Sequence, residues 1–324
     1  MIARTARAPL AGGRAVAVRA LPVLYAVAMV ATAGLLGEPS LLFPEGIALA
    51  LGVWVTARPD WLASRWRIAV LPTACAGLGV LVGLLPGPRS LLAIVALAAA
   101  LVLLLLLRSR LSPALSAAVL PVWFGTGELA YVVLVAAMCT LLAVTAPRAP
   151  VPVRPVRWPA RVLAVFGVCA CGWLALVPVL GLLPLAAAPP LLVACLEFVQ
   201  AGAAPGPGVR RWALLSVAGA AGVAAAVLVQ PGWVAAAVAL TVVSALMWAF
   251  RAPVPPALAT VLVPFVAGVS DPLAAALTIS LGAAVLLAAA AGLRWAVDRY
   301  GQGGRRAAAR SSDEKSDVKD GSSP

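Results

Sequence analysis

The sequence predicts an all-α integral membrane protein: a transmembrane bundle of about twelve helical segments, arranged as two related six-segment halves. Of its 324 residues, 63% are hydrophobic and 11% charged, whereas a soluble domain is about half apolar and about 25% charged. Backbone groups in lipid must be satisfied internally, so only helices or a closed barrel can span a bilayer. The apolar runs are continuous rather than alternating, which favours helices.

Apolar runs follow one another along the chain, and roughly 17 to 25 residues suffice to cross a bilayer as a helix. The first half contains runs at 20–37, 40–57, 68–86, 90–107, 112–126 and 129–146. The second half contains runs at 162–180, 183–202, 212–230, 233–250, 254–268 and 272–293. We therefore expect these parts: a basic cytoplasmic N-terminus (1–19), a first membrane half (20–146), an Arg/Pro-rich cytoplasmic linker (147–161), a second membrane half (162–293) and a disordered cytoplasmic tail (294–324).

The arginines predict the orientation, because basic residues are retained on the cytoplasmic side. They gather in every second break between runs, whereas the alternate breaks hold Arg89 as their basic residue. This pattern predicts a multi-pass plasma-membrane protein with both termini in the cytoplasm. Runs 112–126 and 254–268 reach only about 22 Å as helices, so they either cross or are re-entrant. Crossing fits the arginines better.

The composition argues against several function classes. The chain has no histidine, the commonest general base and metal ligand, and its five cysteines lie inside apolar runs. We expect no catalytic residues, no metal and no cofactor, and hence no enzyme. The net charge of +13 comes without the aromatic-interleaved basic face of a nucleic-acid groove, so nucleic acid is not an expected partner.

An internal similarity links the two halves. Pro113-Ala-Leu matches Pro256-Ala-Leu, and in each half a second proline follows at the same spacing, at Pro121 and Pro264. We call the separation between Pro113 and Pro256 in the sequence the repeat offset. Runs 90–107 and 233–250 are separated by the same offset. Duplication is a common origin of transporters with a site between their repeats.

Part of the second half resembles a known signature. The stretch Val254-Pro-Pro-Ala-Leu-Ala-Thr-Val-Leu262 is similar to His-Pro-Pro-Ala-Gly-Ala-Thr-Ala-Leu of the HPP family of integral membrane proteins. Phe43-Pro-Glu-Gly-Ile-Ala48 and Arg58-Pro-Asp-Trp-Leu-Ala-Ser-Arg65 look like the family's Pro-x-Gly-Ala-Ser-Ala segment and the loop after it. The signature histidine is replaced by Val254, and by Leu111 in the first half. The resemblance implies transport of a small anion similar to nitrite or nitrate.

Two carboxylates inside the runs are candidate functional groups, because ionisable residues in a membrane are costly. Glu45, flanked by Pro44 and Gly46, and Glu197 lie in corresponding second runs. Either could bind or relay a proton. The alternative interpretation places Glu45 at the headgroup boundary and lets Glu197 reach the cytoplasmic side.

The proline-led short runs supply a second set of candidates. A helix N-terminus presents free N–H groups to an anion, and nearby hydroxyls could add donors. The residues are Ser112, Pro113, Ser116, Pro255, Pro256 and Thr260. The alternative is that these prolines only begin helices.

The sequence thus favours a secondary transporter or channel for a small anion, with a carboxylate that could couple it to protons. Two alternatives stay open: a non-transporting scaffold or subunit of a larger complex, and a lipid-carrier flippase. The expected partners are the lipid bilayer, a small anion and a proton. A second copy of the chain, or a cytoplasmic partner bound through 147–161 and the tail, is a further option.

Overall fold

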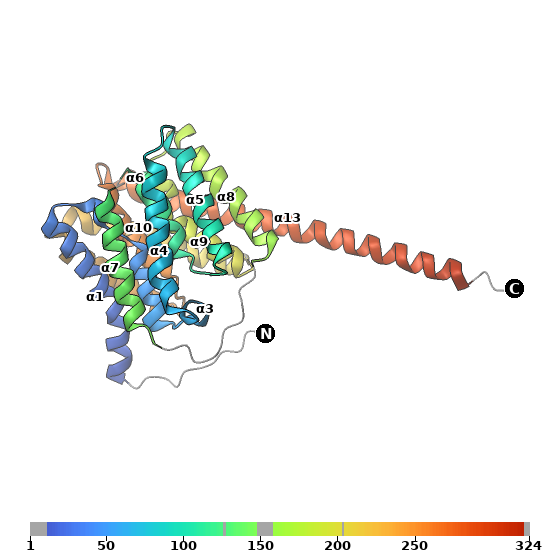
Figure 1. Ribbon diagram of the computed structural model, residues 1–324, viewed down its shortest axis with the longest axis horizontal. Coiled ribbons are helices and arrows are strands. Elements are labelled where there is room, and N and C mark those ends of the chain that lie inside the picture. The colour runs from blue at the N-terminus through green and yellow to red at the C-terminus, as the bar shows by residue number, and fades with distance from the viewer. Residues whose placement is uncertain (1–11, 126–127, 148–157, 203, 321–324) are drawn as a thin grey trace.

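The computed structural model describes residues 12–125, 128–147, 158–202 and 204–320 (Figure 1). Helix accounts for 83% of the structure, and the described residues contain no strand. The helical class predicted from the sequence is therefore confirmed. Apolar residues that cannot hide in a soluble core here form the outer faces of a bundle.

The described part of the first half contains nine helical elements in chain order. They are α1 Gly12–Leu36, the 3₁₀ turn η1 Pro39–Leu41, α2 Glu45–Ala50, the π-helical turn η2 Leu51–Val55, α3 Pro59–Leu62, α4 Arg65–Gly83, α5 Arg89–Leu106, α6 Pro113–Phe124 and α7 Leu129–Thr145. The second half contains α8 Ala160–Val179, the 3₁₀ turn η3 Pro184–Ala187, α9 Pro189–Gln200, α10 Pro205–Leu228, α11 Gly232–Ala249, α12 Pro255–Ala267 and α13 Pro272–Asp320.

Seven described helices are long and apolar enough to cross a membrane: α1, α4, α5, α8, α10, α11 and α13. In each, only 33–44% of the most apolar window is buried inside the protein. The remaining surface carries exposed leucine and valine, including Leu35, Leu106, Val179 and Leu228. Apolar faces of this extent need lipid around them, so the chain is a helical membrane protein.

Four short helices, α2, α6, α9 and α12, form the centre of the bundle. Every residue of α2 is buried, as is every residue of α6 except Phe124 and every residue of α9 except Gln200. A helix that is apolar all round is stable only when protein or lipid covers all its sides. Helix α2 packs against α6 and α12, and α9 packs against the same two helices. The centre is therefore shared between the halves.

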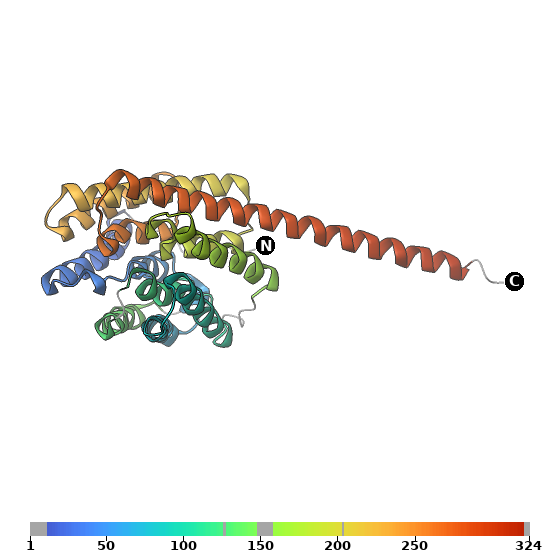
Figure 2. The same cartoon turned by 90° about the horizontal axis from the view of Figure 1, so that it is seen from above.

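Longer helices surround this centre in two groups. Figure 2 shows α4, α5 and α7 along one side of the bundle and α10, α11 and α13 along the other. Helix α1 packs against α11, and α5 packs against α8. Contacts across the halves thus occur at the periphery as well as in the centre.

Two glycines bring long helices against short ones. A Cβ at Gly79 of α4 would collide with the carbonyl oxygen of Ala118 in α6, and a Cβ at Gly222 of α10 would collide with that of Val261 in α12. Small residues permit such backbone approach between membrane helices. Both members of the second pair follow those of the first by the repeat offset.

The helix ends also recur at the repeat offset. The first residues of α5 and α11 are separated by the repeat offset, and so are their last residues. Each is followed by an arginine of positive φ, Arg108 at 49° and Arg251 at 50°. Beyond them, the Ser109 amide donates to Leu104 O at 2.9 Å and the Ala252 amide donates to Met247 O at 3.0 Å.

The C-terminal segment differs from the sequence prediction. We predicted a disordered tail over 294–324, but α13 continues as one helix to Asp320 and projects away from the bundle (Figures 1 and 2). Between Pro272 and Pro324 the chain has no proline, and extending a formed helix costs much less than nucleating one. At the other end α1 begins at Gly12, inside the segment predicted to precede the bundle. Most of the predicted linker, 148–157, lies outside the described residues.

Candidate functional site

Glu45 is the first residue of α2 and lies in the centre of the bundle. Its side chain has an exposed fraction of 0%, and neither carboxylate oxygen has a hydrogen-bond partner among the described residues. Pro44 precedes it and is also buried. An ionised carboxylate in such surroundings costs several kcal/mol unless it is compensated. The Glu45 carboxyl is therefore a group that needs a proton or a cation.

One hydroxyl interacts with this carboxyl, and a second lies against the first turn of α2. Ser116 of α6 interacts with Glu45 without reaching hydrogen-bond geometry, and its hydroxyl has no hydrogen-bond partner in the described part of the chain. The Tyr25 hydroxyl, from α1, lies 3.3 Å from where a Cβ of Gly46 would be and is likewise unpartnered within the described ranges. Gly46 thus allows the Tyr25 ring to lie against the first turn of α2. Glu45, Ser116 and Tyr25 together form what we call the central polar group.

Tyr131 of α7 lies beside this group but has a partner of its own. Its hydroxyl donates to Ala117 O at 3.3 Å, and its ring contacts Phe43 edge-on with centroids 6.5 Å apart. Phe43 is two residues before Glu45. Tyr131 also interacts electrostatically with Glu45, so it belongs to the surroundings of this carboxyl.

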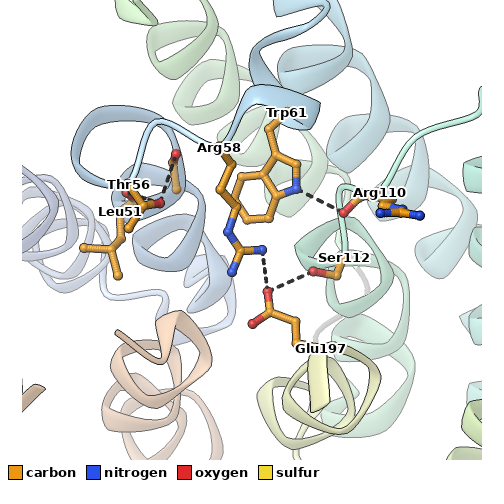
Figure 3. A network of polar contacts seen from close by, with 8 residues as sticks. Leu51, Thr56, Arg58, Trp61, Arg110, Ser112 and Glu197 are labelled. Carbon is orange, nitrogen blue, oxygen red and sulfur yellow. Dashed lines mark hydrogen bonds and ion pairs between the residues drawn. The ribbon is translucent and has the colours of Figure 1, made fainter. Parts of the chain in front are cut away.

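A second polar group, which we call the inter-half ion pair, centres on Arg58. After the π-helical turn η2 the chain reverses at Ala57, where φ is 44°, and the Arg58 amide donates to Gly52 O at 2.9 Å. The Trp61 ring lies over Gly52, where a Cβ would collide with it. The Arg58 guanidinium lies 4.5 Å from the Trp61 ring centroid, and Trp61 Nε1 donates to Arg110 O at 3.0 Å (Figure 3). These contacts fix the direction of the Arg58 side chain.

That guanidinium meets Glu197 of α9. Arg58 Nη1 donates to Glu197 Oε1 at 2.9 Å, and the Ser112 hydroxyl donates to the same oxygen at 3.2 Å (Figure 3). Glu197 has an exposed fraction of 7%, and the Arg58 side chain one of 30%. The three residues come from the loop before α3, the start of α6 and the end of α9. The pair joins residues 139 positions apart, one from each half.

Of the three hydroxyls that the sequence suggested as anion donors, those of Ser112 and Thr260 already donate to acceptors within the protein. Ser112 precedes Pro113 at the N-terminus of α6, and its hydroxyl donates to Glu197. A negative charge is favoured at this end of a helix, and here the protein supplies one itself. In α12, which begins with Pro255 and Pro256, the Thr260 hydroxyl donates to Pro256 O at 2.9 Å, as threonines in helices often do. Both hydroxyl protons are therefore committed to protein acceptors.

More buried donors lie at the end of the bundle that carries Arg58. Arg211 of α10 interacts electrostatically with both Glu197 and Arg58, and its guanidinium lies 5.9 Å from the Phe198 ring centroid. Its Nη1 is buried with no acceptor among the described residues, as is Nε2 of Gln200, one turn after Glu197. Two buried donors without acceptors in the described residues thus lie on α9 and α10, the helices that carry Glu197 and Arg211.

The other end of the bundle holds an apolar pocket of about 500 Å³ between α1 and α11. Its lining includes Gly34, Leu42, Trp233 and Phe265, with Gln230 as a polar member. Glu45, Ser116 and Tyr25 are not among its lining residues.

Metal ligands do not gather in the parts of the chain that the structure describes: no group of three or more Cys, Asp or Glu side chains is placed to hold an ion. The five cysteines are free, and all except the half-buried Cys171 are buried. The candidate sites are therefore built from carboxyl, hydroxyl and guanidinium groups.

The sequence identified some of these residues and missed others. It singled out Glu45, Ser116, Glu197 and Ser112, which the structure divides between the central polar group and the inter-half ion pair. The sequence presents Arg58 only as a loop arginine and as the start of the loop that resembles the HPP family. It presents Arg211 only as a loop arginine and gives no indication of a role for Tyr25. Gly46 and Gly52, against which Tyr25 and Trp61 lie, are the sequence signal for these close contacts. A glycine in a sequence does not, however, reveal which aromatic ring approaches it.

Comparisons of this chain with known protein families, with curated proteins and with solved structures find no match.

Proposed function

We propose that this protein is a secondary transporter that moves a small anion together with protons, and that Glu45 is the proton-binding group. The observation that carries this proposal is the Glu45 carboxyl, wholly buried among short central helices with no hydrogen-bond partner in the described residues. Ionisable groups held inside a membrane bundle commonly mark ion or proton pathways. A carboxyl that is neutral with a proton bound and costly without one can couple proton transfer to a conformational change.

The transporter is built, on this proposal, from two six-segment repeats that cross the membrane twelve times. The described residues contain seven long apolar helices and five shorter apolar ones, which supports twelve segments. Two observations support the repeat: α5 and α11 begin and end at positions separated by the repeat offset, and the close contact of Gly79 with Ala118 recurs at that offset as the contact of Gly222 with Val261. Transporters built from repeats place their sites where the repeats meet, near the middle of the bilayer. The central helices α2, α6, α9 and α12 meet in this way.

The anion is the proposed substrate for two reasons. The resemblance to the HPP family points to nitrite-like or nitrate-like ions, and the end of the bundle around Arg58, Arg110 and Arg211 is rich in guanidinium groups. Positive residues concentrate on the cytoplasmic side, so this end faces the cytoplasm in the proposed orientation, with both termini on the same side. The bilayer in question is the plasma membrane.

The test is uptake of nitrite and nitrate into proteoliposomes that contain the purified protein, with and without an inward proton gradient. We expect gradient-driven uptake by the wild type and its loss in Glu45→Gln, which holds a neutral side chain of the same size. The matched control is Glu128→Gln, an exposed carboxylate between α6 and α7, which should transport as the wild type does. Equal flux in wild-type and empty liposomes would contradict the proposal.

A second candidate function is a membrane scaffold that does not transport. The continuation of α13 to Asp320, away from the bundle (Figure 2), favours this candidate because a projecting helix can reach a cytoplasmic partner. A chain truncated after Arg299 separates the two functions. If the truncated chain transports at the wild-type rate, the transporter function is supported. If neither chain shows measurable flux and truncation removes a protein that co-purifies with the full chain, the scaffold function is supported.

A further inference from the structure

The surroundings of Glu197 are those of a bound anion. One carboxylate oxygen accepts hydrogen bonds from Arg58 at 2.9 Å and Ser112 at 3.2 Å. The carboxylate lies beside the N-terminus of α6, where the helix dipole adds to the attraction. Arginine forks, serine hydroxyls and helix starts are the groups by which proteins recognise oxyanions.

A second guanidinium belongs to the surroundings of this carboxylate. Arg211 interacts electrostatically with both Arg58 and Glu197. Nη1 of Arg211 and Nε2 of Gln200 are buried donors without acceptors in the described parts of the chain. Buried donors of this kind require an acceptor. A second guanidinium and spare buried donors beside the ion pair suit a monovalent oxyanion.

We infer that Arg58, Ser112 and Arg211 form the binding site of a small monovalent oxyanion, and that the carboxylate of Glu197 competes with this anion for Arg58 and Ser112. This inference rests on the proposed function and names the substrate site within it. The anion enters from the Arg58 end, where the guanidinium is 30% exposed. Because Arg58 and Glu197 belong to different halves, an anion that displaces Glu197 also breaks a contact between them.

The test is nitrate binding to the purified protein in detergent, measured by titration calorimetry with no gradient present. Removing the competing charge in Glu197→Gln should tighten nitrate binding by about tenfold, the equivalent of one charge-assisted hydrogen bond. Arg211→Gln should weaken it by about tenfold for the same reason. The matched control, Arg210→Gln, changes an exposed neighbour and should bind as the wild type does.

The direction of the Glu197→Gln effect separates the inference from a purely structural role. If the ion pair only stabilises the fold, the variant melts at a lower temperature and its nitrate affinity does not rise, and this result would overturn the inference. If Glu197→Gln fails to fold, the Arg211→Gln and Arg210→Gln pair carries the test, since equal affinities in those two variants would also overturn it. Absence of nitrate binding in the wild type would do the same.

The binding result is distinguishable from the outcome for the proposed function. If proton-driven uptake is observed but none of these substitutions changes the nitrate affinity, this site is refuted and the transporter proposal stands. Binding that changes as expected without any uptake would refute transport and leave an anion-binding membrane protein.

Discussion

Glu45 and Glu197 occupy corresponding second segments of the two halves but have different neighbours. Glu197 meets Arg58 and Ser112, whereas Glu45 lies beside Ser116 with no hydrogen-bond partner in the described residues. The sequence places both carboxyls within apolar runs, which leaves two interpretations open: burial in the bundle, or Glu45 at the headgroup boundary with Glu197 reaching the cytoplasmic side. It could not predict the difference, since Arg58 belongs to the other half of the chain and its approach to Glu197 depends on how the halves pack.

A single methyl group at Gly79 should destabilise the protein. A Cβ there would collide with the Ala118 carbonyl, so α4 and α6 must separate, and overpacking of this kind costs about 1–3 kcal/mol. We expect Gly79→Ala to melt several degrees below the wild type when unfolding in detergent is followed by tryptophan fluorescence.

The matched control is Gly77→Ala, two residues earlier in α4, where a Cβ meets no atom within 4 Å. Alanine is a better helix former than glycine, so this variant should melt at or above the wild-type temperature. Similar losses in both variants would show that the close approach of α4 and α6 is not what Gly79 provides.

At the scale of the element, the short helices were largely predictable and the irregular turns were not. Helix α6 begins at Pro113 and ends before Gly125, and α12 begins at Pro255 and ends before Gly268, as proline at helix starts and glycine after helix ends lead one to expect. The π-helical turn at Leu51–Val55 has no such local signal. It depends on Trp61 packing over Gly52, which is a tertiary contact.

The direction of α12 through the membrane has a direct test. If α12 crosses, Arg251 and Asp271, which lie at its two ends and are exposed, face opposite sides of the membrane. In a background without the native cysteines, we expect Asp271→Cys in intact cells to react with a membrane-impermeant maleimide. Arg251→Cys should react only after permeabilisation.

The same labelling test applies to α6. Arg108 lies before this helix and Glu128 after it, both are exposed, and each is replaced by cysteine in turn. Labelling of both members of a pair from the same side would mean that the short helix is re-entrant. The arginine distribution would then need another explanation.

At the scale of the whole molecule, the two halves are interlocked rather than separate. Helices α2 and α6 of the first half pack against α12 and α9 of the second, and α1 packs against α11. The repeat offset could be found from Pro113-Ala-Leu and Pro256-Ala-Leu. The faces that meet could not be found in that way, because alanine-rich helices have similar surfaces all round, and their orientation is decided by contacts such as those of Gly79 and Gly222.

The interlocked halves suggest how a proton on Glu45 acts on the anion site. A proton on Glu45 removes a buried charge beside α6, and Ser112, at the N-terminus of α6, donates to Glu197 of the other half. We propose that the protonation state of Glu45 and the contact between the halves are coupled through this short helix. We expect proton movement and anion movement to depend on each other.

The most direct measurement follows the pH inside proteoliposomes with a trapped dye when nitrite or nitrate is added outside at equal internal and external pH. The account predicts that the anion acidifies the interior in liposomes with the wild type or Glu128→Gln, and that Glu45→Gln abolishes this acidification. Anion entry without acidification, or acidification that persists in Glu45→Gln, would contradict the claim that Glu45 couples protons to the anion.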